Sequence, residues 1–324
     1  MSLSSDIATL GGHSMGTRWS VRLVAAPDRD LHRLHAGIQG ELDRVVAQMS
    51  TWEADSDISR YNRAGAGHWQ PLPDDFWQVL AAACSIARQS GGAFDPSLGP
   101  LVALWGFGAH AGVQQVPDTA QRDQAGGHCG WHRLQLDPEA RAVLQPGGLQ
   151  LDLSAIAKGY GVDVVSRWLR DAGVSAALVE VGGELHGYGR KPDGQPWRVL
   201  VESAPEDTAD AAHPPRVLAL DDLAVATSGD RWHRYERDGR RYSHTLDPRT
   251  LAPVAQAAAA VTVIAREAMQ ADAWATALTV MGAVEGLAFA GHHGLAARFL
   301  ARRGEALEET MTPAFQQYLD AAGQ

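Results

Sequence analysis

Cysteine is scarce in this chain: only Cys84 and Cys129 occur among 324 residues. Two cysteines cannot build a disulfide framework or a four-ligand zinc site. Cys84 ends an apolar run that is typical of a buried helix, so we interpret it as an inert core residue. Cys129 lies near His128 and His132, but the spacing fits no standard zinc pattern, and we expect a surface turn there.

Long hydrophobic runs and an excess of positive charge are also lacking. No stretch approaches the roughly 18 apolar residues of a membrane span. Lysine and arginine total 28 against 38 aspartates and glutamates, which gives a net charge of −10. A field of this sign argues against nucleic acid or an anionic membrane as a partner. Any phosphate ligand must therefore be bound by local cations.

The first residues, Met-Ser-Leu-Ser-Ser-Asp, lack the basic and then apolar layout of a signal peptide. We therefore expect a cytoplasmic protein, or one from which a targeting segment has been removed.

What is present is an ordinary globular composition, 45% hydrophobic and 20% charged. Helix-like patterns alternate with strand-like ones, and several strands follow one another as in hairpins. This order predicts a mixed α+β fold with largely antiparallel sheets and flanking helices, not a doubly wound parallel sheet. Residues 204–215 are predicted to form a loop. No clear linker divides the chain, so we expect one domain over residues 1–324.

Asp272 and Thr276 stand four residues apart in an apolar, helix-like segment, 267–281. Residues at this spacing share one helix face. A buried carboxylate is unfavourable unless something pairs with it. A hard cation such as Mg²⁺ takes oxygen ligands and would be such a partner.

A second segment, 151–161, contains Asp152, Ser154 and Lys158. Either Asp152 or Ser154 can cap a helix that begins near Ser154. A helix N-terminus with a nearby lysine suits a phosphate group. Taken alone, an ordinary capped helix with a solvated lysine explains the segment better.

A third segment, 240–250, holds His244 at the end of a predicted strand. Histidine titrates near neutral pH and can act as a general base or bind phosphate. A lone histidine is more often structural than catalytic, so this segment does not define a site by itself.

Together, these segments and several others resemble the ApbE family, the FAD:protein FMN transferases. The matching blocks span roughly residues 14 to 282 and keep the family's order. They are Met15-Gly-Thr17, Met49-Ser-Thr-Trp52, Gly92-Ala-Phe-Asp-Pro-Ser97, Asp152-Leu-Ser-Ala-Ile-Ala-Lys-Gly-Tyr160, Gly182-Gly183, Ala226-Thr-Ser-Gly229, His244-Thr-Leu-Asp-Pro-Arg-Thr250 and Ala271-Asp-Ala-Trp-Ala-Thr-Ala277.

The resemblance implies an ApbE-like fold related to the T-fold. It also implies an enzyme that binds FAD and a divalent metal, normally Mg²⁺. Such an enzyme attaches FMN to a Thr or Ser hydroxyl of an acceptor protein and releases AMP. Acceptors suggested by the family are flavoprotein subunits of redox-driven ion pumps. Family members are often periplasmic and lipid-anchored at the inner membrane, although this chain has no lipobox cysteine near its start.

Carried over by motif, the resemblance assigns metal ligation to the side chains of Asp272 and Thr276 and to the carbonyl of Ala155. His244 is similar to the histidine proposed to activate the acceptor hydroxyl, and with Asp272 it forms the expected catalytic pair. The expected FAD contacts are Met15, Trp52, Ala93, Phe94, Asp95, Asp152, Lys158 and Thr245. Trp52 and Phe94 could flank an aromatic ring, with core packing as the alternative for each.

Three positions depart from the family pattern, among them Gly161, where alanine is common. Leu251 replaces a common glycine, and a turn that needs a positive φ disfavours leucine, so we expect a reshaped loop after Thr250. Ser97 replaces a threonine but keeps the hydroxyl. Two alternatives to protein flavinylation stay open: an FAD pyrophosphatase that yields FMN and AMP, and a non-catalytic FAD-binding protein.

Overall fold

The computed structural model describes residues 6–109, 115–201, 216–229, 234–237, 240–254, 260–303 and 306–322. The loop predicted at 204–215 lies outside these residues. At the centre is an eight-stranded sheet in which all neighbouring strands are antiparallel. In order across the sheet the strands are β1 (Asp6–Ser14), β2 (Thr17–Ala25), β6 (Ala177–Val181), β7 (Glu184–Tyr188), β10 (Leu223–Ser228), β15 (Ala260–Ala265), β16 (Ala296–Arg303) and β17 (Ala306–Met311).

The sheet is apolar on both faces because successive side chains of a strand point to opposite sides. In β6, Val179 and Val181 belong to a hydrophobic core on one face of the sheet, whereas Leu178 belongs to the core on the opposite face. In β15, Val263 likewise packs on the first face and Ile264 on the opposite one. The sheet therefore separates two hydrophobic cores.

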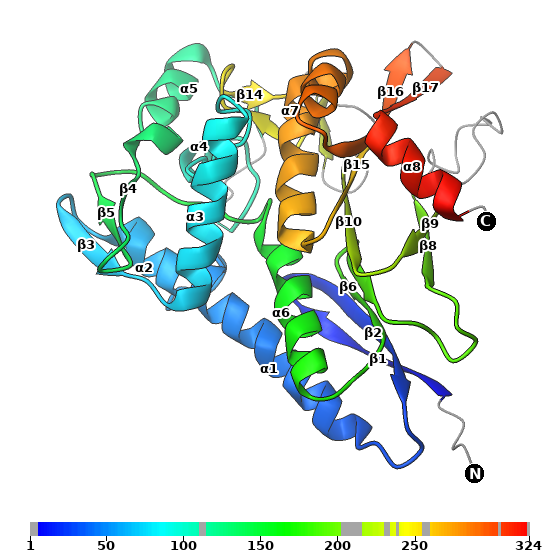
Figure 1. Ribbon diagram of the computed structural model, residues 1–324. Coiled ribbons are helices and arrows are strands. Elements are labelled where there is room, and N and C mark those ends of the chain that lie inside the picture. Colours follow the sequence, from blue (N-terminus) through cyan, green and yellow to red (C-terminus); the bar gives the residue numbers. More distant parts are fainter. Residues whose placement is uncertain are drawn as a thin grey trace.

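Three long helices cover one face of the sheet, α1 (Leu31–Met49), α6 (Ala157–Asp171) and α7 (Ala268–His292), and a fourth, α3 (Asp74–Gln89), packs on α1 and α7 (Figure 1). In α1 the buried residues Leu34, Ile38 and Leu42 recur at four-residue steps, the spacing that predicts an amphipathic helix. The predicted mixed α+β fold with antiparallel sheets and flanking helices is confirmed.

On the opposite face the sheet is covered by the hairpin of β8 (Trp197–Val201) and β9 (Arg216–Leu220) and by α8 (Pro313–Ala322). Trp197 and Phe315 are fully buried there. This core is built from packed apolar side chains, with one cluster of buried charges at its edge.

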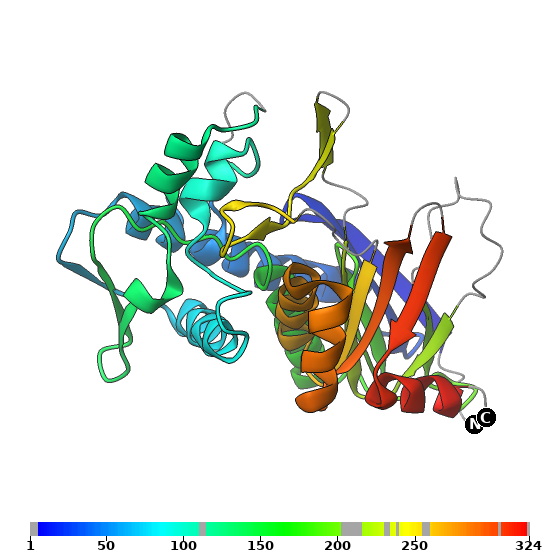
Figure 2. The ribbon, with the colours of Figure 1, turned by 90° about the horizontal axis from the view of Figure 1, so that it is seen from above.

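A second group of elements lies beyond α3, on the side of α7 away from the sheet (Figure 2). It comprises α2 (Asp57–Arg63), α4 (Gly99–Leu104), α5 (Thr119–Gly126), the 3₁₀ turn Trp131–Arg133 and a small sheet of β3 (His68–Pro71), β5 (Ala142–Gln145) and β4 (Gln135–Asp137). Two short hairpins follow in the chain, β11 (Arg234–Arg237) with β12 (Arg240–Ser243) and β13 (Leu246–Asp247) with β14 (Ala252–Pro253).

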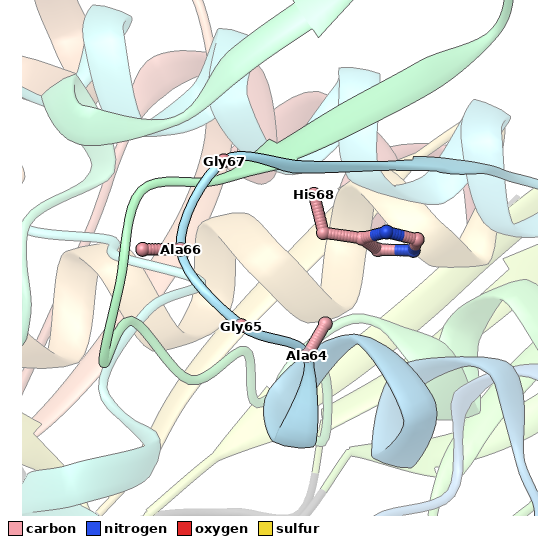
Figure 3. Close-up of a pocket in the computed structure, with 5 residues that line it drawn as sticks. All are labelled: Ala64, Gly65, Ala66, Gly67 and His68. Atoms are coloured by element: carbon pink, nitrogen blue, oxygen red, sulfur yellow. The ribbon is translucent and has the colours of Figure 1, made fainter.

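The turn between α2 and β3 forms a shallow hollow lined by residues 64–68 (Figure 3). His68 supplies the sole side chain in it that carries a nitrogen or oxygen. The hollow lies away from the junction of α6 and α7 in both ribbon views, so it does not mark the predicted site.

Among the described residues, α7 is long and apolar enough, by length and composition, to cross a membrane. This corrects the expectation that no stretch approaches such a length. The reason is its many alanines, which count as apolar although they are small. In this fold 56% of that apolar window is buried inside the protein, and the helix is interrupted at Gly282, where φ is 78°. A buried core helix passes the same test, so the finding is weak evidence for a span.

Cys84 lies in the core, as expected, and is 8% exposed. The expected surface turn is present at Gly127 and His128, which are exposed. Cys129 beside them is only 8% exposed, however, and packs with Leu101, Trp105 and Leu246. Burial raises the pKa of each thiol to about 12, which keeps both protonated and unreactive at neutral pH.

Candidate active site at the junction of two helices

The site is organised by the close approach of α6 to α7. Gly159, in the first turn of α6, lies against the start of α7, and a Cβ there would be 2.3 Å from the carbonyl oxygen of Ala268. Only a glycine allows the two backbones to approach so closely. This contact places Lys158 and the N-terminus of α6 beside the carboxylate of Asp272.

Asp272 lies inside α7, as predicted, and is 5% exposed. Its Oδ2 accepts a hydrogen bond from the backbone N–H of Gly159 at 3.1 Å. Burial raises the pKa of Asp272, while Lys158 and the Gly159 N–H lower it, with a net upward shift. The carboxylate is therefore incompletely compensated by the protein alone.

Lys158 forms an ion pair with Glu184, the first residue of β7. The lysine side chain is 30% exposed, whereas that of Glu184 is 4% exposed. Burial lowers the pKa of Lys158, but Asp272 and Glu184 together raise it, so the lysine is an ammonium at neutral pH. Burial raises the pKa of Glu184 despite the ion pair, and its Oε2 is buried without a hydrogen-bond partner. Two carboxylates thus face one ammonium here.

The donor atoms near Asp272 fit a hard cation. Thr276 is one helical turn further along α7 and is partly buried, as the shared face predicts. Ala155 lies in the turn that leads into α6. A carboxylate, a hydroxyl and a carbonyl form an all-oxygen set suited to Mg²⁺, which usually retains several waters. No cluster of three His, Cys, Asp or Glu side chains occurs among the described residues, which argues against a zinc-type centre there.

The helix-cap prediction for segment 151–161 is wrong in detail. The helix α6 begins at Ala157, and its N-cap, Ile156, makes no side-chain cap. Asp152 instead accepts hydrogen bonds from the N–H and Oγ of Ser154, within the preceding turn. These bonds stabilise the turn that contains Ala155. The first turn of α6 is instead capped by Asp272 of α7, which accepts a hydrogen bond from the N–H of Gly159.

Two tight hairpin turns border α6. In the β1–β2 turn, Met15 (φ 53°) and Gly16 (φ 70°) both have positive φ, the geometry of a two-residue type I′ turn. The sulfur of Met15 lies 3.2 Å from a Cβ built on Gly161, so it contacts α6. In the β6–β7 turn, a Cβ on Gly182 would lie 3.3 Å from Cδ of Lys158. Both turns therefore approach the lysine end of the site.

The loops that carry Asp95 and Asp152 lie side by side, since the N–H of Asp152 donates to the carbonyl of Pro96 at 2.8 Å. The Asp95 carboxylate accepts from the N–H and Oγ of Ser97 and from the N–H of Trp131. Burial raises the pKa of Asp95, against those hydrogen bonds. The Ser97 hydroxyl also accepts from Gly130 N–H at 2.7 Å, so the serine keeps the structural role of a threonine hydroxyl.

The aromatic residues predicted to flank a ring have different environments. Trp52, in the turn after α1, is 73% exposed and available for stacking. Phe94 is 3% exposed and packs in the main core, as does its neighbour Ala93. The core-packing alternative therefore holds for the Phe94 ring, and its part in a ligand site would involve the backbone. Trp105 is buried too.

His244 precedes β13 and is partly buried, and Thr245 beside it is 6% exposed. This segment is joined to α7 through Arg249. The Arg249 guanidinium bonds to both oxygens of Asp247 and donates to the carbonyl of Val280 in α7 at 3.2 Å. The expected reshaping after Thr250 is wrong: Leu251 adopts φ 56° and so keeps the left-handed turn.

The fold thus brings Met15, Lys158 and Asp272 around the first turns of α6. Thr276 and Ala155 lie on the same two elements or next to them. The described contacts do not link Trp52 to this junction. Sequence reasoning missed Glu184, whose signal is its position directly after the Gly182–Gly183 turn. It also missed Asp163, a carboxylate among valines in α6.

Comparisons with known proteins agree with the resemblance. The ApbE family model matches residues 15–299. An FAD:protein FMN transferase of Salmonella typhimurium is 34% identical over 313 residues, which cover 96% of this chain and 89% of that protein. The apo crystal structure of the Pseudomonas stutzeri flavinyl transferase ApbE has a TM-score of 0.89 and 38% identity, with 97% of each chain covered. The flavin transferase ApbE from Vibrio cholerae also has a TM-score of 0.89, with 32% identity over 97% of this chain and 100% of that one.

Proposed function

This chain belongs to the ApbE family, and we propose that it is an FAD:protein FMN transferase that uses Mg²⁺ and modifies a Thr or Ser hydroxyl of an acceptor protein. The observation that carries the metal-dependent part is the buried Asp272 carboxylate. It lies one turn before Thr276 and beside the ammonium of Lys158 and the N-terminus of α6. A dication would offset the excess carboxylate of this junction and so allow an anionic diphosphate to bind there.

In the proposed reaction, the acceptor hydroxyl oxygen attacks the phosphorus on the FMN side of the FAD diphosphate. An oxygen–phosphorus bond to the acceptor forms, and the bond from that phosphorus to the bridging oxygen breaks. The bridging oxygen leaves with AMP, and His244 takes the hydroxyl proton as a general base. Phosphoryl transfer depends mainly on positioning and charge neutralisation, which suits a site with few reactive side chains.

The protein's own groups divide this work. Asp272, Thr276 and the Ala155 carbonyl would hold Mg²⁺, which supplies Lewis-acid stabilisation of the phosphate charge. Lys158 adds a local cation, which a chain of net charge −10 needs if it is to bind a diphosphate. The exposed ring of Trp52 is available to stack on the flavin. The remaining proposed FAD contacts are Met15, Ala93, Phe94, Asp95, Asp152 and Thr245.

The acceptor we propose is a flavoprotein subunit of the redox-driven ion pump type. The decisive experiment incubates the protein with FAD, Mg²⁺ and a domain that bears a Ser/Thr-Gly-Ala-Ser/Thr segment. Mass spectrometry should show acceptor with one added FMN, and EDTA should prevent the addition. Unmodified acceptor beside free FMN and AMP would instead identify an FAD pyrophosphatase. Bound FAD that stays intact would identify a non-catalytic FAD-binding protein.

The role of His244 has its own test. His244→Ala should retain FAD binding, measured by flavin fluorescence, yet slow acceptor modification by about 10²–10⁴-fold if the imidazole is the general base. His132→Ala, on the 3₁₀ turn, is the control and should leave the rate unchanged. An unchanged rate in His244→Ala would remove this histidine from the mechanism.

A further inference from the structure

The N-terminus of α7 is capped by a residue of another helix. The N-cap residue of α7, Glu267, makes no side-chain cap hydrogen bond. Instead, Asp163 of α6 accepts from the N–H of Ala268 at 2.8 Å and from the N–H of Met269 at 2.9 Å, one bond to each carboxylate oxygen. Asp163 is 7% exposed, so these backbone groups are its main source of stabilisation. The first N–H groups of a helix have no partner within the helix, and this carboxylate satisfies two of them.

The capping is reciprocal. Asp272 of α7 accepts from the N–H of Gly159 in the first turn of α6. Each helix therefore offers an N–H from its first turn and, four residues later, a carboxylate to the other helix: Gly159 and Asp163 on α6, Ala268 and Asp272 on α7. The backbones approach closely enough for this exchange because residue 159 has no side chain.

We propose that Asp163 is a positioning residue for the metal site: it fixes the start of α7 so that Asp272 holds its cation in place. The inference rests on the proposed function. Asp163 itself binds no substrate or metal. Its two bonds set the position of the first turn of α7 relative to α6, and Asp272 is one turn further on. The bond from Gly159 then engages Oδ2 of Asp272, so that Oδ1 is the oxygen we assign to the cation.

If Asp163 were only a structural cap, its substitution would have a different effect on the metal titration. Loss of an N-cap lowers stability wherever the helix lies. That loss would lower the melting temperature equally with and without metal. A residue that orients a metal ligand instead changes metal affinity, and such changes are typically about 10–100-fold. The two roles therefore separate in a metal titration.

The experiment measures melting temperature against Mg²⁺ concentration at saturating FAD. Binding to the folded state alone raises the melting temperature, so wild-type protein should show a rise with a defined half-maximal Mg²⁺ concentration. In Asp163→Asn, where the amide cannot accept at both positions, that concentration should increase by about 10–100-fold. FAD affinity measured in EDTA should stay close to wild type.

The matched control is Asp30→Ala, which removes a helix cap elsewhere, because Asp30 caps α1 through the N–H of Arg33. It should lower the melting temperature without moving the Mg²⁺ midpoint. An Asp163→Asn midpoint equal to wild type, in a protein whose wild type responds to Mg²⁺, would overturn this inference alone. A wild type that modifies its acceptor in EDTA and shows no response to Mg²⁺ would overturn the metal site and this inference with it. If Asp163→Asn does not fold, Asp163→Ser, which retains a capping oxygen, is measured in its place. Its half-maximal Mg²⁺ concentration is then compared with that of the wild type.

Discussion

Two clusters of buried charge lie on opposite sides of the central sheet, and they differ in the sign of their excess. At the α6–α7 junction the carboxylates of Glu184 and Asp272 face the single ammonium of Lys158. At the sheet edge the single carboxylate of Glu309 faces two guanidiniums. Arg298 donates to it at 2.6 Å, and Arg216 donates through two nitrogens.

The pKa directions of the two glutamates follow from this difference. Burial raises the pKa of both carboxyls. At Glu309 the hydrogen bonds from Arg216 and Arg298 outweigh burial, so its pKa lies below the usual value. At Glu184 the single ion pair with Lys158 does not outweigh it, and the pKa lies above. At the sheet edge the single carboxylate is already bonded by two cations, whereas the excess of carboxylate at the junction leaves a place for a cation.

The prediction with the largest expected effect removes the carboxylate of the proposed metal site. Asp272→Ala should lose about 10⁴-fold in metal-dependent turnover, because Lewis-acid stabilisation contributes several kcal/mol. The measurement is the rate of FMN addition to the acceptor. Asp272→Asn, of equal size, controls for packing and should be similarly inactive. Turnover near the wild-type rate in both variants would refute the site.

The second removes the carboxylate of the sheet-edge cluster. Glu309→Ala should destabilise the fold by about 3–5 kcal/mol, because it leaves the buried Arg298 guanidinium without this counter-ion. Denaturant unfolding measures the loss. Turnover per folded molecule should not change, since this cluster is structural. The double variant Arg298→Met, Glu309→Leu should recover most of the stability, and a double variant no better than the single one would contradict the assignment.

The third prediction neutralises the excess negative charge at the α6–α7 junction. Glu184→Gln should weaken Mg²⁺ affinity by about 10-fold, because a nearby negative charge that attracts the cation is lost. The unfolding free energy should fall as well, because the buried ion pair between Glu184 and Lys158 is reduced to a hydrogen bond. A magnesium titration of FMN transfer reads the affinity. Glu180→Gln, a partly exposed glutamate bonded to Ser20, is the control, and equal shifts in both variants would count against a local effect.

The smallest effect concerns a position outside both clusters. Leu251→Gly removes left-handed backbone strain of about 1–2 kcal/mol but also removes packing of similar size. We expect a net change within about 1 kcal/mol of unfolding free energy in urea. Leu251→Ala loses the packing and keeps the strain, so it should be clearly less stable than the glycine variant. Equal losses would mean that the turn is not strained.

The helix faces and the motif order were predictable because they depend on local spacing. The apolar run around Asp272 indicated a buried carboxylate, and the structure buries it. The same pattern surrounds Asp163, between Val162 and Val164, and it predicts a buried partner equally well. What spacing could not give was the partner, since the N–H groups that bind Asp163 belong to α7, over 100 residues later in the chain.

Local propensity failed where tertiary contacts supply the stabilising energy. Leucine is disfavoured at positive φ, yet Leu251 holds that conformation. Its carbonyl accepts from Trp105 Nε1 at 3.1 Å, and its side chain occupies the space beside Gly126. Cys129 was assigned to a surface turn because its spacing from His128 and His132 fits no standard zinc pattern. The packing of α4 against α5 buries it instead.

By itself the sequence determined which residues are available for chemistry, because residue type and periodicity fix what a side chain can ligate and which helix face it shares. It also determined the alternating strands and hence the class of fold. Only the tertiary structure decided that α6 and α7 cap each other, that Glu184 lies against Lys158, and that the junction holds one carboxylate more than the lysine can balance. Those contacts join segments far apart in the chain, and their energies depend on burial, which no local pattern specifies.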